Sequence, residues 1–343
     1  MSMTAPNILV VGSPVETSIE QMYFRAFKSI GCSDVDVLDV EGDIERWMRS
    51  KVVHRLLPEL GNKKAGLILE TYLRNSRDKY SHIIIFKGMQ FSRKLLDRCR
   101  GMTPSAYWIN INPDSPWNLE SRAATNTNVI EALNFFDAYC TWSLSIAEKL
   151  KGVGCRSCIY LPFGYDAHHH TPPNFASKYR SDTLVFIGSW DNAREDLLAK
   201  LSGVEVDVRI YGNGWHKAAR SFPWKNSVKN GGVFGRQMAE VTASSMLCLN
   251  PMRAQNFGAH NMRTFEIPAM GGLMLTTRSE EQNSFFPENE ASYMYADIEE
   301  LKEKIRFVAR HSTEADRVRA RGMELAREHS YSRRAQYLLE AVT

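Results

Sequence analysis

Glu266 stands out in the sequence because it is a carboxylate inside an apolar run. The run, NMRTFEIPAMGGLMLTT at residues 261–277, predicts a helix that ends at Gly271–Gly272 and then a buried strand. An ionised carboxylate in such surroundings needs hydrogen-bond donors, because its burial without them is unfavourable. Either the helix dipole or Arg263, three residues earlier, stabilises the charge, or the carboxylate is held for the hydroxyl groups of a ligand.

Glycines and polar side chains recur where the predicted strands of the second half of the chain end. Small residues let a ligand approach the backbone, and helix N-termini with nearby arginines bind phosphate groups. A carboxylate beside such groups suits the hydroxyls of a ribose. Each glycine alone indicates no more than a turn, but together they predict a diphosphate site with Glu266 as the ribose ligand. Its other members are Gly188, Ser189, Arg194, Gly212, Asn213, Asn250, Arg253, Asn261 and Arg263.

Four other motifs do not fit the chemistry that they suggest. The aspartates of DVD, residues 34–36, lie in a predicted strand, which disfavours a metal site. Cys155 and Cys158 form a CxxC that opens a strand rather than a helix and has no second pair. The run His168–His170 predicts an exposed loop, because adjacent side chains point in different directions. The first strand is followed by Gly12-Ser13-Pro14 and not by a glycine-rich nucleotide motif, which argues against nicotinamide enzymes and P-loop ATPases.

The candidate residues need a scaffold of parallel strands. Apolar strands alternate with amphipathic helices in the first half, as in NILVVG at 7–12 and the helix that follows it, and the alternation restarts at TLVFIGSW, residues 183–190. The polar stretch 163–182 between them is typical of a domain connection. We predict an α/β protein of two Rossmann-like domains facing a cleft, because ligands of such sheets bind at the carboxyl ends of strands.

Helices are expected at several further places along the chain. Two are predicted near 43–57 and 64–77, and others close the chain from about 297 to 342. The last of them, YSRRAQYLLEAV, has an apolar stripe that needs a partner surface. Arg333 and Arg334 lie toward the opposite side and are expected to be solvated or to meet acidic groups.

Bulk properties narrow the class of protein. The chain has 343 residues and a net charge of +4, which favours two domains and permits anionic ligands or peripheral contact with a membrane. It does not indicate nucleic acid as a partner. No apolar run reaches the ~18–20 residues needed to cross a bilayer, and MSMTAPNILVVGS lacks the basic region of a signal peptide. The scattered cysteines suit reduced thiols, so we expect a cytoplasmic protein.

The sequence resembles the GT-B glycosyltransferases of the group-1 type, and within them the spore-maturation CgeB-like proteins. The resemblance is strongest from about residue 138 to 343. It rests on segments that come in the family's order: FDAYCTWS, YLPFGYDAHHHTPP, LVFIGSW, VRIYGNGW, LNPM, NMRTFEIPAMGGLMLT and EHSYSRRAQYLLEAV. The first 130 residues match in strand–helix rhythm and in ININPDSPWN.

This resemblance implies a domain arrangement and a reaction. Residues 1–165 would form an acceptor domain, 166–329 a domain for the nucleotide-sugar donor, and 330–343 a helix that crosses back to the first domain. The activity would be metal-independent transfer of a sugar from a nucleotide diphosphate, with no cofactor besides the donor. The acceptor would be a glycan, a polysaccharide or a protein.

The resemblance also implies roles for individual residues. Glu266 falls where the family's glutamate binds the ribose, and Asn261 and Arg263 fall beside the diphosphate. Many relatives carry a second glutamate where this chain has Ala259, so the donor sugar needs another partner. His260 or Arg253 is the candidate for that role.

Mechanism adds three candidate catalytic residues, which are Asp114, Arg194 and Arg263. The two arginines, together with Arg253, would stabilise the departing diphosphate. Asp114, just after WININ, is the candidate base of an inverting enzyme, although an Asx turn explains it equally well. The resemblance favours a retaining enzyme, which needs no protein base. Two other functions stay open, namely a non-catalytic protein that binds nucleotide sugars or acts as a scaffold, and a sugar-nucleotide epimerase of the same fold.

Overall fold

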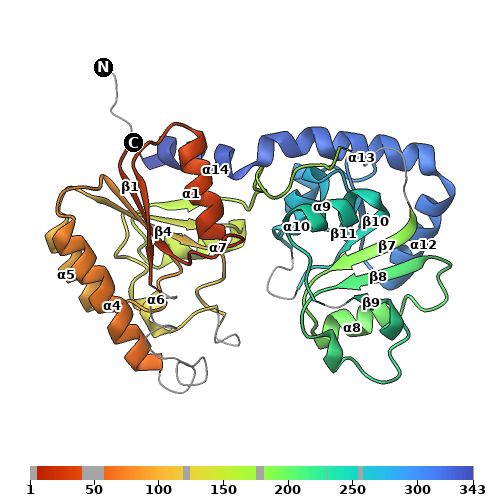
Figure 1. The fold of residues 1–343 in the computed structure, drawn as a ribbon, viewed down its shortest axis with the longest axis horizontal. Coiled ribbons are helices and arrows are strands. Elements are labelled where there is room, and N and C mark those ends of the chain that lie inside the picture. The colour runs from red at the N-terminus through yellow and green to blue at the C-terminus, as the bar shows by residue number, and fades with distance from the viewer. Residues whose placement is uncertain are drawn as a thin grey trace. The chain divides into compact units, whose positions relative to one another are not determined.

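The computed structural model describes residues 6–40, 58–118, 124–174, 181–229, 231–253 and 258–342. The chain divides into two compact units, each with its own sheet (Figure 1). Unit 1 is Met1–Pro162 with Tyr331–Thr343, and unit 2 is Phe163–Ser330. The helix expected near 43–57 lies outside the described residues.

The sheet of unit 1 is parallel throughout, with strand order β2-β1-β3-β4-β5-β6. The strand β1 pairs on one side with β2 and on the other with β3, so Ile8 lies opposite both Val35 and His82. Strands buried on both faces are apolar almost throughout, which explains runs such as ILVVG and HIIIF. The strands are β1 Ile8–Gly12, β2 Val35–Asp39, β3 His82–Phe86, β4 Tyr107–Asn112, β5 Ala138–Thr141 and β6 Cys158–Tyr160.

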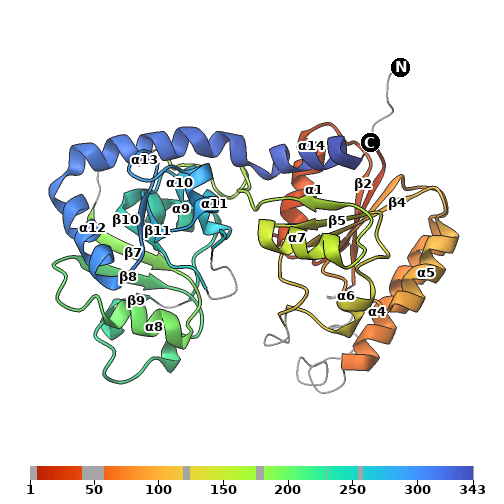
Figure 2. The ribbon, with the colours of Figure 1, turned by 180° about the vertical axis from the view of Figure 1, so that it is seen from behind.

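Helices cover both faces of this sheet. Figures 1 and 2 show α4 and α5 together on one side of it, and α1 with α14 on the other. Two of the helices begin at a serine whose hydroxyl accepts from a backbone N–H of the first turn: Ser18 caps α1 and Ser92 caps α5. The helices are α1 Ile19–Ser29, α4 Pro58–Asn75, α5 Arg93–Met102, α6 Thr127–Glu131, α7 Leu144–Gly152 and α14 Tyr331–Val342.

The C-terminal helix α14 packs against α1 inside unit 1. Its apolar stripe buries Tyr331, Ala335 and Leu338, and the ring centroids of Tyr331 and Tyr23 are 5.0 Å apart. The expectation that Arg334 is solvated was wrong. Its side chain is partly buried, and loss of water lowers the pKa of its guanidinium while Tyr23, Tyr160 and Tyr331 lie near enough to oppose that shift.

The sheet of unit 2 is also parallel, with strand order β12-β11-β10-β7-β8-β9. The strands β8 and β9 are added on one side of β7, and β10, β11 and β12 are added on its other side. The topological switch point therefore lies between β7 and β10. Ligands of such sheets bind outside the carboxyl ends of the strands at that point. The strands are β7 Ser181–Ile187, β8 Asp207–Tyr211, β9 Val228–Lys229, β10 Ser245–Asn250, β11 Met274–Thr277 and β12 Tyr293–Tyr295.

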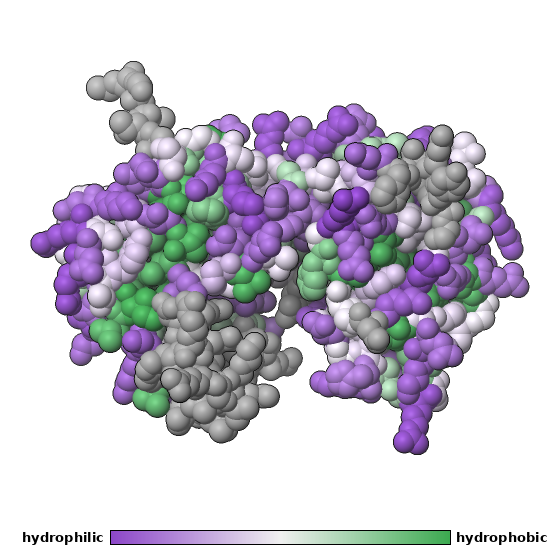
Figure 3. Space-filling view, in the orientation of Figure 1, coloured by the Kyte–Doolittle hydropathy of each residue, from purple (hydrophilic) through white to green (hydrophobic). Residues whose placement is uncertain are grey.

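The helices of unit 2 bury apolar stripes against this sheet. The helices α10 and α13 pack together on one side of it, and α8 lies on the other (Figures 1 and 2). Hydrophilic residues cover the outer side of α13 (Figure 3). Among the described residues, no helix combines the length and the apolar character that crossing a membrane requires. The helices are α8 Asn192–Ala199, α9 Gly235–Ser244, α10 Arg263–Ala269, α11 Glu280–Phe285, α12 Ile298–Arg310 and α13 Ser312–Ala326.

Arg319 is a buried cation that ties α13 to the sheet. Its Nη2 donates to the carbonyl oxygens of Ser245 (3.2 Å) and Met246 (2.8 Å), and its Nη1 donates to that of Gly271 (3.3 Å). The pairing of β10 with β7 shifts register between Ser245 and Leu247, which is where Arg319 takes two of its carbonyls. The side chain thus satisfies backbone groups at an irregular end of the ladder.

Replacing Arg319 with methionine should destabilise unit 2 by about 2–4 kcal/mol. Methionine keeps the apolar stem but removes the guanidinium that donates to these carbonyl oxygens, and an unsatisfied buried group costs ~1–3 kcal/mol. Urea unfolding followed by far-UV circular dichroism would measure the change. Arg321→Met, at an exposed position of the same helix with an ion pair to Glu324, is the matched control and should change stability by less than about 0.5 kcal/mol. Equal unfolding midpoints for the two variants would contradict the prediction.

Candidate functional site

The loop after β7 is held by residues of α8. Asp191 is the N-cap of α8, where its Oδ1 accepts from the backbone N–H of Arg194 at 2.9 Å. The Arg194 side chain turns back so that Nη1 donates to the carbonyl oxygen of Ser189 at 2.8 Å. Its guanidinium also lies 5.4 Å from the ring centroid of Phe186. Arg194 is therefore fixed in place beside the carboxyl end of β7.

The loops after β7 and β8 pack directly against each other. A Cβ atom on Gly212, whose φ is +151°, would lie 2.0 Å from the carbonyl oxygen of Gly188, so no other residue fits at 212. Hydrogen bonds join the loops as well, from the N–H of Trp190 to the carbonyl oxygen of Asn213 at 2.8 Å and from Trp215 Nε1 to that of Gly188 at 2.9 Å. The packing of the two loops thus explains these glycines by itself, and their contact with a donor stays a prediction.

The end of β10 is joined to the start of α10 by a pair of amides. Asn261 Nδ2 donates to Asn250 Oδ1 at 2.9 Å, and Asn250 Nδ2 donates to Asn261 Oδ1 at 3.3 Å. Asn261 Oδ1 also accepts from the backbone N–H of Thr264 at 3.1 Å, in the manner of an N-cap. These bonds fix the first turn of α10, which carries Arg263 and Glu266, against the carboxyl end of β10.

Arginines from three segments meet at the switch point between β7 and β10. Arg253 Nε lies 3.2 Å from Asp191 Oδ2, and Arg194 Nε lies 3.6 Å from the same oxygen. Arg263 Nε donates to the carbonyl oxygen of Ile187, the last residue of β7, at 3.5 Å.

The electrostatics of this cluster favour an anion. Burial lowers the pKa of Arg194 to about 10; Arg253 and Arg263 add to that shift by repulsion, and Asp191 opposes it. At neutral pH Arg194 is still charged, because a pKa of about 10 lies well above 7. A ligand with negative charges at this position would relieve the repulsion among them.

Glu266 is buried, with 1% of its surface exposed, and two side chains lie against its carboxylate. Arg263 Nη1 donates to Oε2, and His170 Nε2 lies 3.6 Å from Oε1. Arg263, which the sequence suggested as a partner that stabilises the charge of Glu266, therefore contacts this carboxylate in the structure. The binding of ligand hydroxyls by Glu266 stays a prediction.

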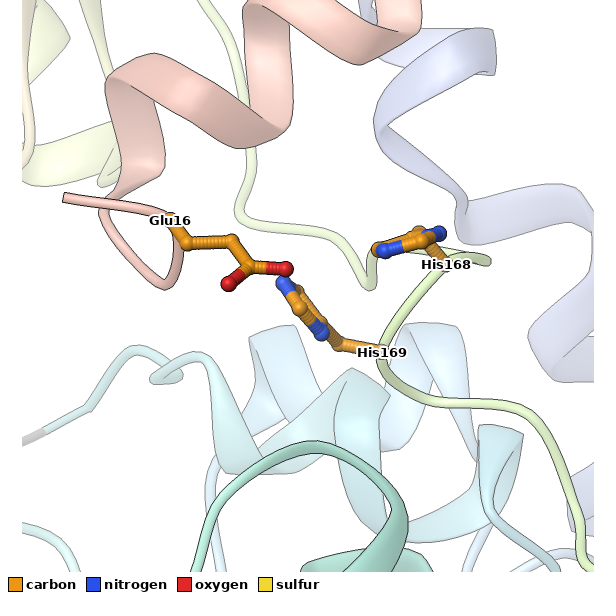
Figure 4. Close-up of side chains that lie close together, drawn as sticks. All are labelled: Glu16, His168 and His169. Atoms are coloured by element: carbon orange, nitrogen blue, oxygen red, sulfur yellow. The ribbon is translucent and has the colours of Figure 1, made fainter. Parts of the chain in front are cut away.

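The run His168–His170 is not uniformly exposed, and for His170 the prediction was wrong. His168 is exposed and His169 half-buried, and their rings lie close together with the ring planes at 68° to each other (Figure 4), whereas only 4% of His170 is exposed. A turn at Asp166 causes the difference. The carbonyl oxygen of Asp166 accepts from the backbone N–H groups of His169 (3.1 Å) and His170 (2.8 Å), and its own N–H donates to His170 Nδ1 at 3.1 Å.

His260 occupies a different environment from the one that a donor ligand requires. The ring is fully buried. Its Nε2 accepts from the backbone N–H of Phe163 at 3.2 Å, and its Nδ1 lies 2.8 Å from Glu281 Oε2. Both nitrogens are thus used within unit 2, and the ring packs edge-on against Phe265. Because both nitrogens already have partners, Arg253, with a half-exposed side chain, is the better placed of the two residues predicted to replace the glutamate missing at Ala259, and that role stays a prediction.

In unit 1, Asp114 follows β4 and is paired with a lysine that the sequence did not suggest. Lys87 Nζ lies 2.6 Å from Asp114 Oδ2, and the Asp114 N–H donates to Asn112 Oδ1 at 3.0 Å. Lys87 follows β3 and has φ of +56°, an unfavourable backbone conformation for a non-glycine residue. In this sheet β2 is added on one side of β1, and β3 and the later strands are added on the other, so the switch point lies between β1 and β3. Lys87, at the end of β3, lies at that point.

Comparison with solved structures finds the same fold in known glycosyltransferases and related enzymes. Sucrose-phosphate synthase from Thermosynechococcus elongatus matches with a TM-score of 0.73 at 11% identity over 98% of each chain. HepE from Anabaena, in complex with UDP-glucose, matches with a TM-score of 0.67 at 11% identity over 98% of this chain and 99% of that one. TarM from S. aureus, in complex with fondaparinux, alpha-GlcNAc-glycerol and UDP, gives 0.60 at 12% identity over 81% of this chain. The match to TarM covers only 59% of the TarM chain.

The chain therefore has the GT-B fold, with two α/β units that each contain a parallel sheet. Residues 194–340 also match a family model described as glycosyl transferase-like. That segment contains Arg194, Arg253, Arg263 and Glu266. A search of curated proteins found no match.

Proposed function

We propose that the protein is a glycosyltransferase that moves a sugar from a nucleotide diphosphate sugar to a glycan, polysaccharide or protein acceptor. The observation that carries the proposal is the arginine cluster at the switch point of unit 2, formed by Arg194, Arg253 and Arg263, with Glu266 buried beside it. An anion-binding cluster next to a carboxylate is suited to the diphosphate and ribose of such a donor. The fold and the match of residues 194–340 support this function.

Arg263 has a double role in this proposal. Its guanidinium lies across Glu266 and is itself partly exposed, with 28% of its side-chain surface accessible. Rotation of this side chain would carry the charge to the donor phosphates and uncover the carboxylate for the ribose. In the reaction, Arg263 and Arg194 would stabilise the negative charge that develops on the departing diphosphate.

The finer assignments rest on the resemblance to the group-1 and CgeB-like enzymes. We propose that the enzyme transfers a hexose-type sugar with retention of configuration, and that unit 1 takes the acceptor. Retention needs no protein base, so Asp114, with its ion pair to Lys87, would position the acceptor rather than remove its proton. The anomeric configuration of the product, read by proton NMR from the coupling constant of the anomeric hydrogen, distinguishes retention from inversion.

Calorimetry with UDP, GDP and their glucose conjugates tests the function directly. We expect one of the bases to bind, with slow hydrolysis of the matching nucleotide sugar in the absence of acceptor. Binding without any hydrolysis or transfer would instead favour a scaffold, and interconversion of donors without acceptor would favour an epimerase. Failure of every nucleotide and nucleotide sugar to bind would contradict the proposal.

Donor hydrolysis should survive treatment with EDTA. Arginines and helix N-termini would neutralise the phosphates in place of a divalent ion. The measurement compares the initial hydrolysis rate of the nucleotide sugar before and after chelation and gel filtration, and we expect the two rates to agree within about twofold, or ~0.4 kcal/mol of activation free energy. Loss of activity that manganese or magnesium restores would show that the reaction needs a metal.

A further inference from the structure

His170 is a buried histidine whose tautomer is fixed by the backbone. The N–H of Asp166 donates to Nδ1 at 3.1 Å, so Nδ1 is an acceptor and the proton of the neutral ring is on Nε2. Burial lowers the pKa of the imidazole; Glu266 opposes this shift, Arg263 adds to it, and Asp166 and His169 make smaller opposite contributions. The ring is thus neutral at neutral pH, and Nε2, which carries its proton, lies 3.6 Å from Glu266 Oε1.

The two partners of Glu266 differ in their freedom to move. Arg263 is partly exposed and comes from the helix that carries Glu266, whereas 5% of the His170 side chain is exposed and the Asp166 turn holds it. If Arg263 turned toward a diphosphate, His170 would remain against the carboxylate. Oε1 of Glu266 would then keep the neutral His170 ring beside it, and Oε2 would be available to accept hydrogen bonds from ligand hydroxyls.

We propose that His170 is a positioning residue for Glu266: it orients the buried carboxylate from the segment that opens unit 2, so that the site distinguishes a ribose with hydroxyls from one without them. The inference rests on the proposed function, because it assumes that a nucleoside diphosphate binds at this site. It extends that function by assigning ribose recognition to two elements, α10 and the turn at Asp166.

The test compares UDP and GDP with their 2′,3′-dideoxy forms by calorimetry on the full chain. If the wild-type protein binds UDP, we expect it to prefer UDP over dideoxy-UDP by about 10- to 100-fold, the range that charged hydrogen bonds provide. His170→Phe, which keeps a ring but has no N–H donor, should reduce that preference by about tenfold. His170→Gln, which retains an N–H donor near the position of Nε2, should keep most of it. His168→Phe, at an exposed position of the same run, should leave it unchanged.

A double-variant cycle separates positioning from a general effect on the fold. If His170 acts through Glu266, adding His170→Phe to Glu266→Gln should cause no further loss of the preference for ribose hydroxyls. If His170→Phe does not fold, His170→Met takes its place, because methionine adapts to an irregular space. An unchanged preference in folded His170→Phe, or in His170→Met where that variant replaces it, would overturn the inference and leave the proposed function intact. Failure of the wild-type protein to bind any of the nucleotides would overturn both.

Discussion

Arg263→Met should weaken binding of a nucleoside diphosphate by about 30-fold or more. The side chain contacts Glu266 and the end of β7, and loss of one partner of a desolvated charge pair typically costs ~2–5 kcal/mol of binding free energy. The same change should lower the free energy of unfolding by about 2–3 kcal/mol, because the buried Glu266 carboxylate loses its charged partner. Calorimetry with UDP or GDP measures the first effect and urea unfolding the second.

A second substitution separates these two effects. In Arg263→Met with Glu266→Gln, the buried charge is removed together with its partner, so most of the lost stability should return. Binding should not return, because the charge that meets the phosphates is still absent. Arg321→Met, on the outer side of α13, is the control for removal of an arginine as such. If Arg263→Met binds nucleotide as tightly as the wild-type protein, the arginine cluster is not the diphosphate site.

Deleting residues 331–343 should unfold unit 1 and leave unit 2 folded. The deletion removes Tyr331, Ala335 and Leu338 from a buried interface and uncovers Tyr23 on α1. Each large apolar side chain contributes ~1.5–3 kcal/mol through burial, so Tyr331, Leu338 and Tyr23 together account for about 4.5–9 kcal/mol, which is comparable to the stability of a whole domain. Limited proteolysis with mass spectrometry would identify the unit that becomes susceptible. Sugar transfer should be lost while nucleotide binding, measured by calorimetry, is largely retained.

Single substitutions in α14 provide a graded version of the same experiment. Leu338→Ala, at a fully buried position, should destabilise unit 1 by about 2–4 kcal/mol. Tyr337→Ala, at the neighbouring position with 49% of the residue exposed, should change stability by less than about 0.5 kcal/mol. A truncated protein that resists protease in unit 1 and keeps full turnover would show that α14 makes no essential contribution.

The sequence was sufficient for the scaffold because periodicity and strand–helix alternation are local properties. Parallel strands are buried on both faces, so their sequences are apolar almost throughout. The runs ILVVG, HIIIF and SMLCLN form β1, β3 and β10 in the structure. The short strands β9 and β12 were not predicted. A strand of two or three residues has too few positions to establish a period of two. The apolar stripe of α14 was visible from sequence. The partial burial of Arg334 was not, because Tyr23 and Tyr160, two of its three tyrosine neighbours, come from distant parts of the chain.

For the candidate site, the sequence determined which residues follow the strands, and the parallel sheet brings those of β7 and β10 together at one edge. That was enough to nominate Arg194, Arg253, Arg263 and Glu266, because the carboxyl ends of neighbouring parallel strands must meet. Only the tertiary structure decided which polar groups already have partners within the protein. His260 is buried with both nitrogens bonded, and Gly212 is required by the carbonyl of Gly188. His170 reaches Glu266 through a turn whose hydrogen bonds leave no periodic signal in the sequence, since a side chain's partners depend on three-dimensional distance and not on its spacing along the chain.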